Sequence, residues 1–191
     1  MTKIAVITGS IREGSYNQML AKLAIAQLEA HGAEVTEIDL ATFDLPLYSA
    51  AIEANDFPQD ALRLKQLLTE QDGLLVVSPE YNGSIPPLLK NAIDWASRPT
   101  GDEGLVALTA YRGKAAAIMS ASLSPFGGLR GLMHLREILT TIQMVVIPDQ
   151  VVIPAAHAAY DSDGQLKEEL PATLISIATA RLIKVAAALN D

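Results

Sequence analysis

The sequence predicts an α/β domain in which a parallel β-sheet is covered by helices on both faces. Short runs rich in β-branched residues alternate along the chain with longer segments that carry apolar residues at helical spacing. This alternation is the pattern of strand–helix–strand units. The run Leu74-Leu75-Val76-Val77 is continuously apolar, as expected for a strand that is buried on both faces.

Five strands are expected, each a short apolar run. They are Ile4–Thr8, Glu34–Ile38, Gly73–Ser78, Ala115–Ser120 and Met144–Ile147. Five helices are expected between and after them, each marked by apolar residues three and four positions apart. Their apolar stripes run over Leu20–Leu28, Ala61–Leu68, Leu88–Ala96, Leu132–Ile142 and Leu174–Leu189, and the first helix is expected from about Tyr16 to Ala30.

This alternation suggests a flavodoxin-like three-layer sandwich with a five-stranded parallel sheet of order 2-1-3-4-5, the order being an analogy with that fold. A chain of 191 residues without repeats or low-complexity segments fits a single domain, residues 1–191. In such sheets ligands bind outside the carboxyl ends of the strands, near the point where the strand order reverses. The loops after the first, third and fourth strands are therefore expected to carry the unusual residues.

Composition argues against several classes of partner and chemistry. The formal net charge of −8 argues against nucleic acid, which requires a basic face. The chain has no cysteine, which removes disulfides, thiol catalysis and iron–sulfur ligation and suits a reducing compartment. No targeting segment and no run of about 18 apolar residues is visible. We therefore expect a cytoplasmic protein that makes no membrane contact.

Metal and hydrolase chemistry also lack their motifs. His31, His134 and His157 are far apart in the sequence, and neither an H-E-x-x-H nor a G-x-S-x-G motif is present. The run Asp161–Gly164 resembles the start of a calcium loop but lacks the glutamate at its twelfth position. We therefore expect a turn at Asp161–Gly164 and no metal site.

The loop after the first strand, Thr8–Asn17, has the chemistry of a phosphate site. It contains two glycines, the cation Arg12 and three small polar side chains, which are Ser10, Ser15 and Asn17. These groups can donate to phosphate oxygens, and the amides and dipole at a helix N-terminus favour an anion. Ser15 and Gln18 also have the spacing of a capping box, which satisfies a helix end without a ligand. The two interpretations are compatible, because Ser15 can begin the helix whose amides the phosphate meets.

The loops after the third and fourth strands suit a flat ligand. In Ser78–Pro86, a planar heterocycle can stack near Tyr81 and receive hydrogen bonds from backbone amides and Asn82. A simple turn with Ser84 as a helix N-cap explains the serine and the prolines, but not Glu80, Tyr81 and Asn82 together. In Ser120–Arg130, small hydroxyls and paired glycines allow a close approach of the backbone, although an ordinary turn has the same composition.

Together these loops resemble the NADPH-dependent FMN reductase family, a flavodoxin-like group that includes quinone, azo-dye and chromate reductases. The resemblance rests on G-S-I-R-E-G-S-Y-N at 9–17, S-P-E-Y-N-G-S-I-P-P-L-L-K-N-A-I-D-W at 78–95 and S-A-S-L-S-P-F-G-G-L-R at 120–130. The segments Val152–Pro154 and Tyr160–Leu166 are also similar to that group. The insert Leu123–Pro125 and the span Thr100–Arg112 depart from its pattern.

The resemblance implies an oxidoreductase that uses FMN, takes hydride from NADPH or NADH and reduces a small acceptor such as a quinone, an azo compound, a metal oxyanion or free flavin. Flavin N5 would carry the hydride, so we assign no catalytic acid or base. The implied contacts with the phosphate and ribityl chain are Ser10, Arg12, Ser15, Tyr16 and Asn17. Those with the ring are Pro79, Glu80, Tyr81, Asn82, Gly83 and Ser122, while Gly127, Gly128 and Arg130 would border the cleft. The family also implies a homodimer or homotetramer.

Two other functions fit the same cofactor. A flavodoxin-type electron carrier would bind FMN and pass single electrons to proteins, and the net charge of −8 is compatible with it. A redox-sensing flavoprotein without steady turnover is the second. The sequences R-E-G-S-Y-N and P-E-Y-N favour the reductase.

Overall fold

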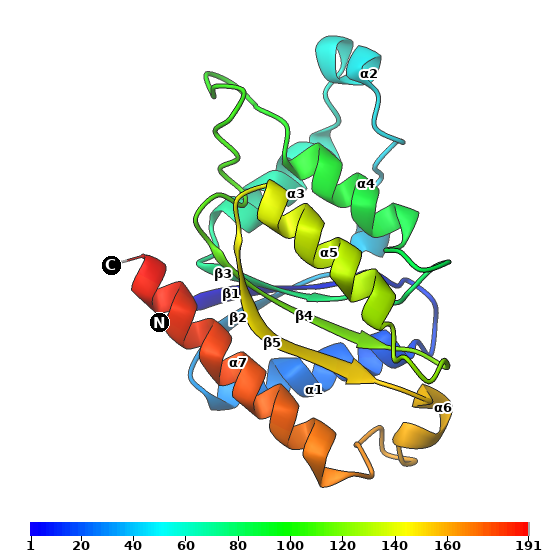
Figure 1. Ribbon diagram of the computed structural model, residues 1–191. Helices are drawn as coiled ribbons and strands as arrows, with labels where there is room; N and C mark the ends of the chain where they lie inside the picture. The colour runs from blue at the N-terminus through cyan, green and yellow to red at the C-terminus, as the bar shows by residue number, and fades with distance from the viewer. Residues whose placement is uncertain (191) are drawn as a thin grey trace.

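The computed structural model describes residues 1–190 and places five parallel strands in one sheet of order β2-β1-β3-β4-β5 (Figure 1). The strands are β1 Lys3–Thr8, β2 Glu34–Ile38, β3 Gly73–Val77, β4 Ala115–Ala121 and β5 Val145–Ile153. The order and the parallel pairing confirm the flavodoxin-like prediction.

Helices cover both faces of the sheet, so that the molecule has three layers (Figure 1). One face is covered by α1 Tyr16–Ala30 and α7 Glu169–Leu189. The other is covered by α3 Gln59–Thr69, α4 Pro87–Ala96 and α5 Leu129–Thr141. Three short elements were not expected, namely the 3₁₀ turn η1 Leu40–Thr42, α2 Ala50–Asn55 and α6 Ala156–Ala159. Each is too short to show a helical stripe in the sequence.

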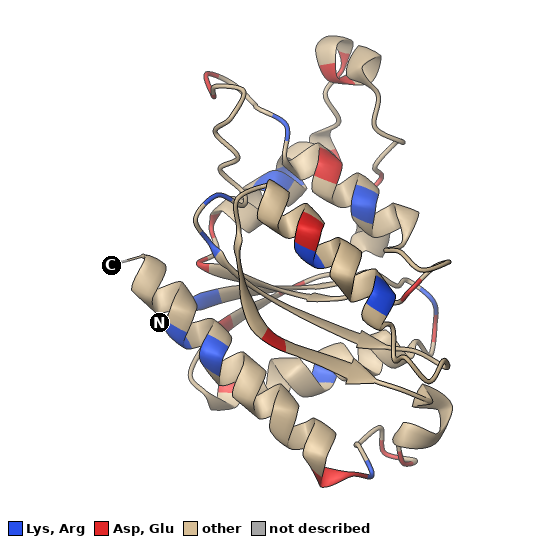
Figure 2. Ribbon diagram, viewed as in Figure 1, with Lys and Arg blue, Asp and Glu red and all other residues tan. Residues whose placement is uncertain are grey.

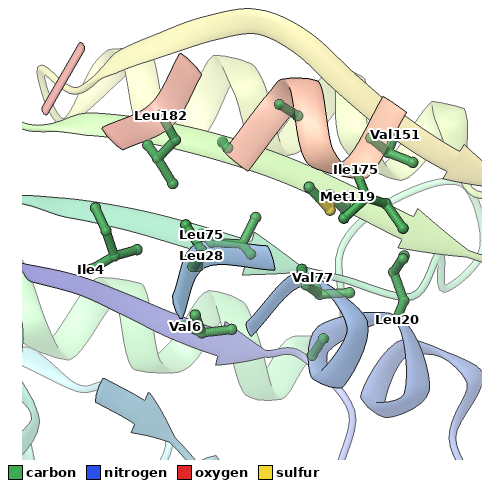
Figure 3. Packing of buried hydrophobic residues seen from close by; sticks show 14 of the residues in the cluster. Ile4, Val6, Leu20, Leu28, Leu75, Val77, Met119, Val151, Ile175 and Leu182 are labelled. Carbon is green, nitrogen blue, oxygen red and sulfur yellow. The ribbon is translucent and has the colours of Figure 1, made fainter. Parts of the chain in front are cut away.

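Each face of the sheet has its own apolar core, because successive strand residues point to opposite faces. Ile4 and Val6 of β1 pack toward α1 and α7, whereas Ala5 and Ile7 pack on the other side. Figure 3 shows the first of these cores, in which Leu75 of β3 lies among side chains from β1, β4, α1 and α7. These two cores fix the strand ends on which the candidate site is built.

Strand β5 continues well beyond the predicted end at Ile147. Pro148, the next residue, cannot donate a ladder hydrogen bond, and proline within a sheet is confined to edge strands, strand starts and bulges. However, β5 lies at the edge of the sheet and its register with β4 shifts between Ala116 and Ile118. An edge strand with such an irregularity tolerates proline, so the strand runs through Pro148 and ends at Ile153.

Helix α7 is long and apolar enough, by length and composition alone, to cross a membrane. Its buried residues Ile175, Ala178, Leu182 and Ala186 recur at three- and four-residue spacing and pack against the sheet. This arrangement is that of a helix facing a protein core.

A lysine with a largely buried side chain anchors the segment between α4 and β4. Lys65 Nζ, on α3, donates to the Arg98 carbonyl at 2.7 Å and to Thr100 Oγ1 at 3.0 Å, and it forms an ion pair with Glu103. Glu103 also accepts a hydrogen bond from the Thr109 hydroxyl at 2.7 Å. These contacts hold the first part of Thr100–Arg112, the span that departs from the family pattern.

We expect acid to release this anchor. Burial opposes ionisation of Glu103, but hydrogen bonds from Lys65, Thr109 and the Thr100 amide outweigh that penalty and lower its pKa to about 2, from an ordinary value of 4.5. A depressed folded-state pKa stabilises the fold above the unfolded pKa, and this stabilisation is lost as the pH falls through the folded value. In urea unfolding between about pH 5 and pH 2, Glu103→Gln should therefore show a weaker pH dependence of the unfolding free energy than the wild type. Equal pH dependence would contradict the assignment.

Candidate functional site

Three loops meet at the carboxyl edge of the sheet and enclose a cavity of about 240 Å³. Its lining comes from the loops after β1, β3 and β4, as the fold rule predicts. The lining residues are Ser10, Arg12, Ser15, Tyr16, Asn17, Pro79, Glu80, Tyr81, Ala121, Ser122 and Leu123. Of the predicted ligand contacts, Asn82 and Gly83 lie outside this lining, while Ala121 and Leu123 were not predicted.

The first loop ends in a capped helix that faces the cavity. Ser15 is the N-cap of α1, and its Oγ accepts a hydrogen bond from the Asn17 amide at 3.3 Å. Gln18 does not close the expected capping box, because its side chain donates to the Ser10 carbonyl at 3.2 Å. Arg12 is exposed at this end of the cavity. The loop thus combines a helix N-terminus, two hydroxyls and a cation, which is a donor set suited to a phosphate.

Asn17 lines the cavity, but its side chain is used mainly to join two loops. The residue is buried, and its Nδ2 donates to the Ala121 carbonyl at 2.8 Å while its Oδ1 accepts from the Ala121 amide at 2.9 Å. This paired contact ties the first turn of α1 to the end of β4. The geometry favours a positioning role over the predicted direct donation to phosphate.

A tight hairpin turn shapes the second loop. The amide and carbonyl of Tyr81 pair with those of Ser84 at 2.8 and 3.0 Å, and Asn82 and Gly83 between them have φ of 52° and 82°. Two positive φ values with the sequence Asn-Gly are typical of a type I′ turn. The turn presents Tyr81 at the cavity with half of its surface exposed. Helix α4 starts from Pro86 as N-cap, so Ser84 belongs to the turn and does not cap the helix.

Glu80 joins the second loop to the start of α5. Its side chain is 6% exposed, and it accepts hydrogen bonds from the Arg130 Nε at 2.8 Å and from the Arg130 and Gly131 amides at 3.1 and 3.3 Å. A carboxylate at a helix N-terminus stabilises that end. The Glu80 carboxylate is therefore engaged by the protein and holds the second loop to the start of α5.

Gly128 allows the third loop to pass close to the sheet. It is the N-cap of α5 with φ of 92°, and a Cβ atom there would lie 1.9 Å from Ser120 Oγ and 2.8 Å from Ser120 Cβ. A side chain at this position would force apart the third loop and β4. The paired glycines of the sequence are thus explained in part by this close approach.

We expect Gly128→Ala to lower the unfolding free energy by about 2 to 5 kcal/mol, the sum of left-handed backbone strain and overpacking. Gly113→Ala is the matched control, because Gly113 has φ of +75° and a Cβ atom added there would meet nothing within 4 Å. The unfolding free energy of this control should fall by only about 1 to 2 kcal/mol. Urea unfolding of both variants measures the difference, and equal losses would contradict a steric role for Ser120.

The sequence patterns missed the contact of Tyr160 with this site. Its ring stacks on Tyr16 with centroids 5.9 Å apart and planes 9° from parallel, and its hydroxyl donates to the Tyr16 carbonyl at 3.2 Å. Neither the local residue spacing nor the expected strand order predicts a contact between Tyr160 and Tyr16. The signal in the sequence was the similarity of Tyr160–Leu166 to the family.

The arrangement fits a phosphorylated ligand with a flat ring. The first loop lines the cavity with the hydroxyls of Ser10 and Ser15 and the Arg12 guanidinium, and we call the part that it lines the phosphate end. The second loop lines it with Pro79 and the half-exposed ring of Tyr81. These groups match the phosphate and the isoalloxazine of FMN in chemistry.

Comparison with known proteins gives concordant results. A family model described as NADPH-dependent FMN reductase matches residues 2–158. A 2-hydroxy-1,4-benzoquinone reductase from Burkholderia sp is 37% identical over 168 residues, covering 87% of this chain and 86% of that relative. An NAD(P)H-dependent FMN reductase from Pseudomonas aeruginosa is 36% identical over 174 residues, covering 91% and 89%. The solved structure of FerB, a flavoenzyme NAD(P)H:(acceptor) oxidoreductase from Paracoccus denitrificans, superposes with a TM-score of 0.83 at 30% identity, covering 98% of both chains.

Proposed function

Because the chain belongs to the NADPH-dependent FMN reductase family, we propose that the cavity formed by its three loops holds FMN. The chain is an FMN-dependent NAD(P)H oxidoreductase that reduces a small acceptor, and we propose that this acceptor is a quinone. The observation that carries the site is the convergence of nearly all the predicted ligand contacts on one cavity. The quinone is supported by the names of relatives, which include a 2-hydroxy-1,4-benzoquinone reductase and quinone reductases.

We assign the residues of the site to two roles. Ser10, Arg12, Ser15, Tyr16 and the first amides of α1 bind the phosphate and the ribityl chain, and Pro79, Tyr81 and Ser122 lie along the ring. The other predicted contacts act on the loops: Asn17 joins the first to the third, Glu80 joins the second to α5, and Asn82 and Gly83 form the turn behind Tyr81.

When bound, FMN supplies the atom that accepts and returns hydride. The residues of the chain bind the cofactor and orient it. Arg12 neutralises phosphate charge, the helix N-terminus donates amides, and the hydrogen bonds of Asn17 and Glu80 keep the loops in place before the ligand arrives. Such preorganisation reduces the ordering cost of binding.

We also propose that the chain forms one domain, residues 1–191, and assembles as a homodimer or homotetramer in the cytoplasm without nucleic acid or membrane. The exposed apolar side chains Leu47, Leu105 and Val106 support self-association; they lie in the two segments that project beyond α4 and α3 in Figure 1. Acidic and basic residues are interspersed over the helices and loops (Figure 2), and the net charge is −8. Mass in solution, measured by light scattering, tests the assembly.

Steady-state turnover tests the proposed function. The FMN-loaded protein is mixed with NADPH or NADH and excess 1,4-benzoquinone, and nicotinamide oxidation is followed at saturating quinone with free FMN as the control. We expect many turnovers per bound flavin. A flavodoxin-type carrier or a sensor would bind FMN yet oxidise the nicotinamide negligibly, and that result would contradict the proposal.

A further inference from the structure

The chain that follows β5 crosses the carboxyl edge of the sheet before it enters α7 (Figure 1). We call residues Ile153–Lys167 the strap. Main-chain hydrogen bonds fasten its start to the third loop, because the Ser122 amide donates to the Ile153 carbonyl at 3.0 Å and the Ala156 amide donates to the Ser122 carbonyl at 3.0 Å. The strap is thus a direct neighbour of a loop that lines the cavity.

Tyr160 fastens the other part of the strap to the first loop. Its side chain is buried, its ring stacks on Tyr16, and its hydroxyl donates to the Tyr16 carbonyl at 3.2 Å. Tyr16 is the first residue of α1 and follows the N-cap Ser15. Tyr160 therefore acts on the helical turn whose amides and hydroxyls form the phosphate end of the cavity.

A hollow and a left-handed residue mark the side of the strap that faces α7. Between the strap and the start of α7 lies a mainly apolar hollow of about 290 Å³, lined by residues that include Pro154, Ala158, Leu166 and Pro171. Ala155, at the bend before α6, has φ of 44°, a left-handed conformation that costs an alanine about 1 to 2 kcal/mol. Ala156 and Tyr160 of the strap pack into the core on the α1 and α7 face of the sheet, so the strap is held by that core together with its contacts to the first and third loops.

We propose that Tyr160 is a positioning residue for the phosphate end of the site. It holds the first turn of α1 in place through Tyr16, while the strap's main-chain bonds hold the third loop. Tyr160 lies outside the cavity lining, so it acts on the site through Tyr16. This proposal rests on the assignment of the cavity to FMN.

The test compares affinities for FMN and riboflavin, since riboflavin lacks the phosphate. Apo-proteins of the wild type, Tyr160→Leu and Tyr160→Phe are titrated with each flavin by fluorescence quenching, and thermal unfolding is recorded. We expect Tyr160→Leu to weaken FMN about tenfold, through loss of the stack and the hydrogen bond, and riboflavin by less than about threefold. Tyr160→Phe keeps the stack, and we expect it to weaken FMN about threefold.

Tyr48→Leu is the matched control, because Tyr48 packs edge-on against Trp95, whose ring centroid is 5.2 Å away, and lies outside the cavity lining. The control should lower the melting temperature without changing the ratio of FMN to riboflavin affinity. An unchanged ratio in the Tyr160 variants, with wild-type preference for FMN intact, would overturn the role of Tyr160 alone. A wild type without preference for FMN would overturn the cavity assignment as well. If Tyr160→Leu does not fold, the ratio of FMN to riboflavin affinity in Tyr160→Phe tests the role of Tyr160.

Discussion

Arg12→Ala is expected to weaken FMN binding about 10- to 100-fold while changing riboflavin binding by less than about threefold. The reason is that hydrogen bonds to charged groups contribute about 1.5 to 3 kcal/mol, and the phosphate is the charged group that distinguishes the two flavins. Arg12 is exposed at the cavity, so its removal should leave the fold intact. Equilibrium titration of the apo-protein with each flavin measures both affinities.

Arg112→Ala provides the control for this prediction. Arg112 is also exposed, but it lies in the segment before β4 and outside the cavity lining. Its replacement removes the same charge from the protein and should leave both affinities unchanged. Parallel losses of FMN and riboflavin in Arg12→Ala would contradict the phosphate role.

Asn17→Ala is expected to lower the unfolding free energy by about 2 to 6 kcal/mol. The substitution leaves the buried amide and carbonyl of Ala121 without the partners they have at 2.9 and 2.8 Å, and each unsatisfied group costs about 1 to 3 kcal/mol. Since Asn17 joins the phosphate end of the cavity to β4, affinity for both flavins should fall. Urea unfolding and flavin titration measure the two effects.

Asn55→Ala is the control for stability, because Asn55 is an exposed residue whose side chain contacts its own helix, at the Ala51 carbonyl. It should change the unfolding free energy by less than about 0.5 kcal/mol. If Asn17→Ala instead weakens the affinity for FMN but not for riboflavin, and leaves the unfolding free energy unchanged, Asn17 donates to the phosphate directly.

Most of the fold could be predicted because it depends on local patterns. Strand β3 is an unbroken apolar run and α1 a periodic one, and both lie where the sequence indicates, with β3 ending one residue early. The end of β5 could not be predicted, because tolerance of Pro148 depends on the strand's place at the sheet edge. Helices α2 and α6 have six and four residues, too few for a stripe.

The location of the site could also be predicted, but not what every residue does there. The loops were found from their position after β1, β3 and β4, which the fold rule makes informative. The partners of Asn17 and Glu80 lie 104 and 50 residues away in the sequence. Because these hydrogen bonds depend on tertiary structure, the sequence alone does not distinguish residues that contact a ligand from residues that position a loop.

Hydrogen exchange of the apo-protein with and without FMN tests the central claim, that the cavity between the three loops holds the cofactor. We predict that FMN slows amide exchange in peptides covering residues 9–17, 78–84 and 121–124, and leaves the segments 44–58 and 100–112 unchanged. Protection that appears instead around the hollow behind the strap, or along the projecting segment at α2, would contradict the account.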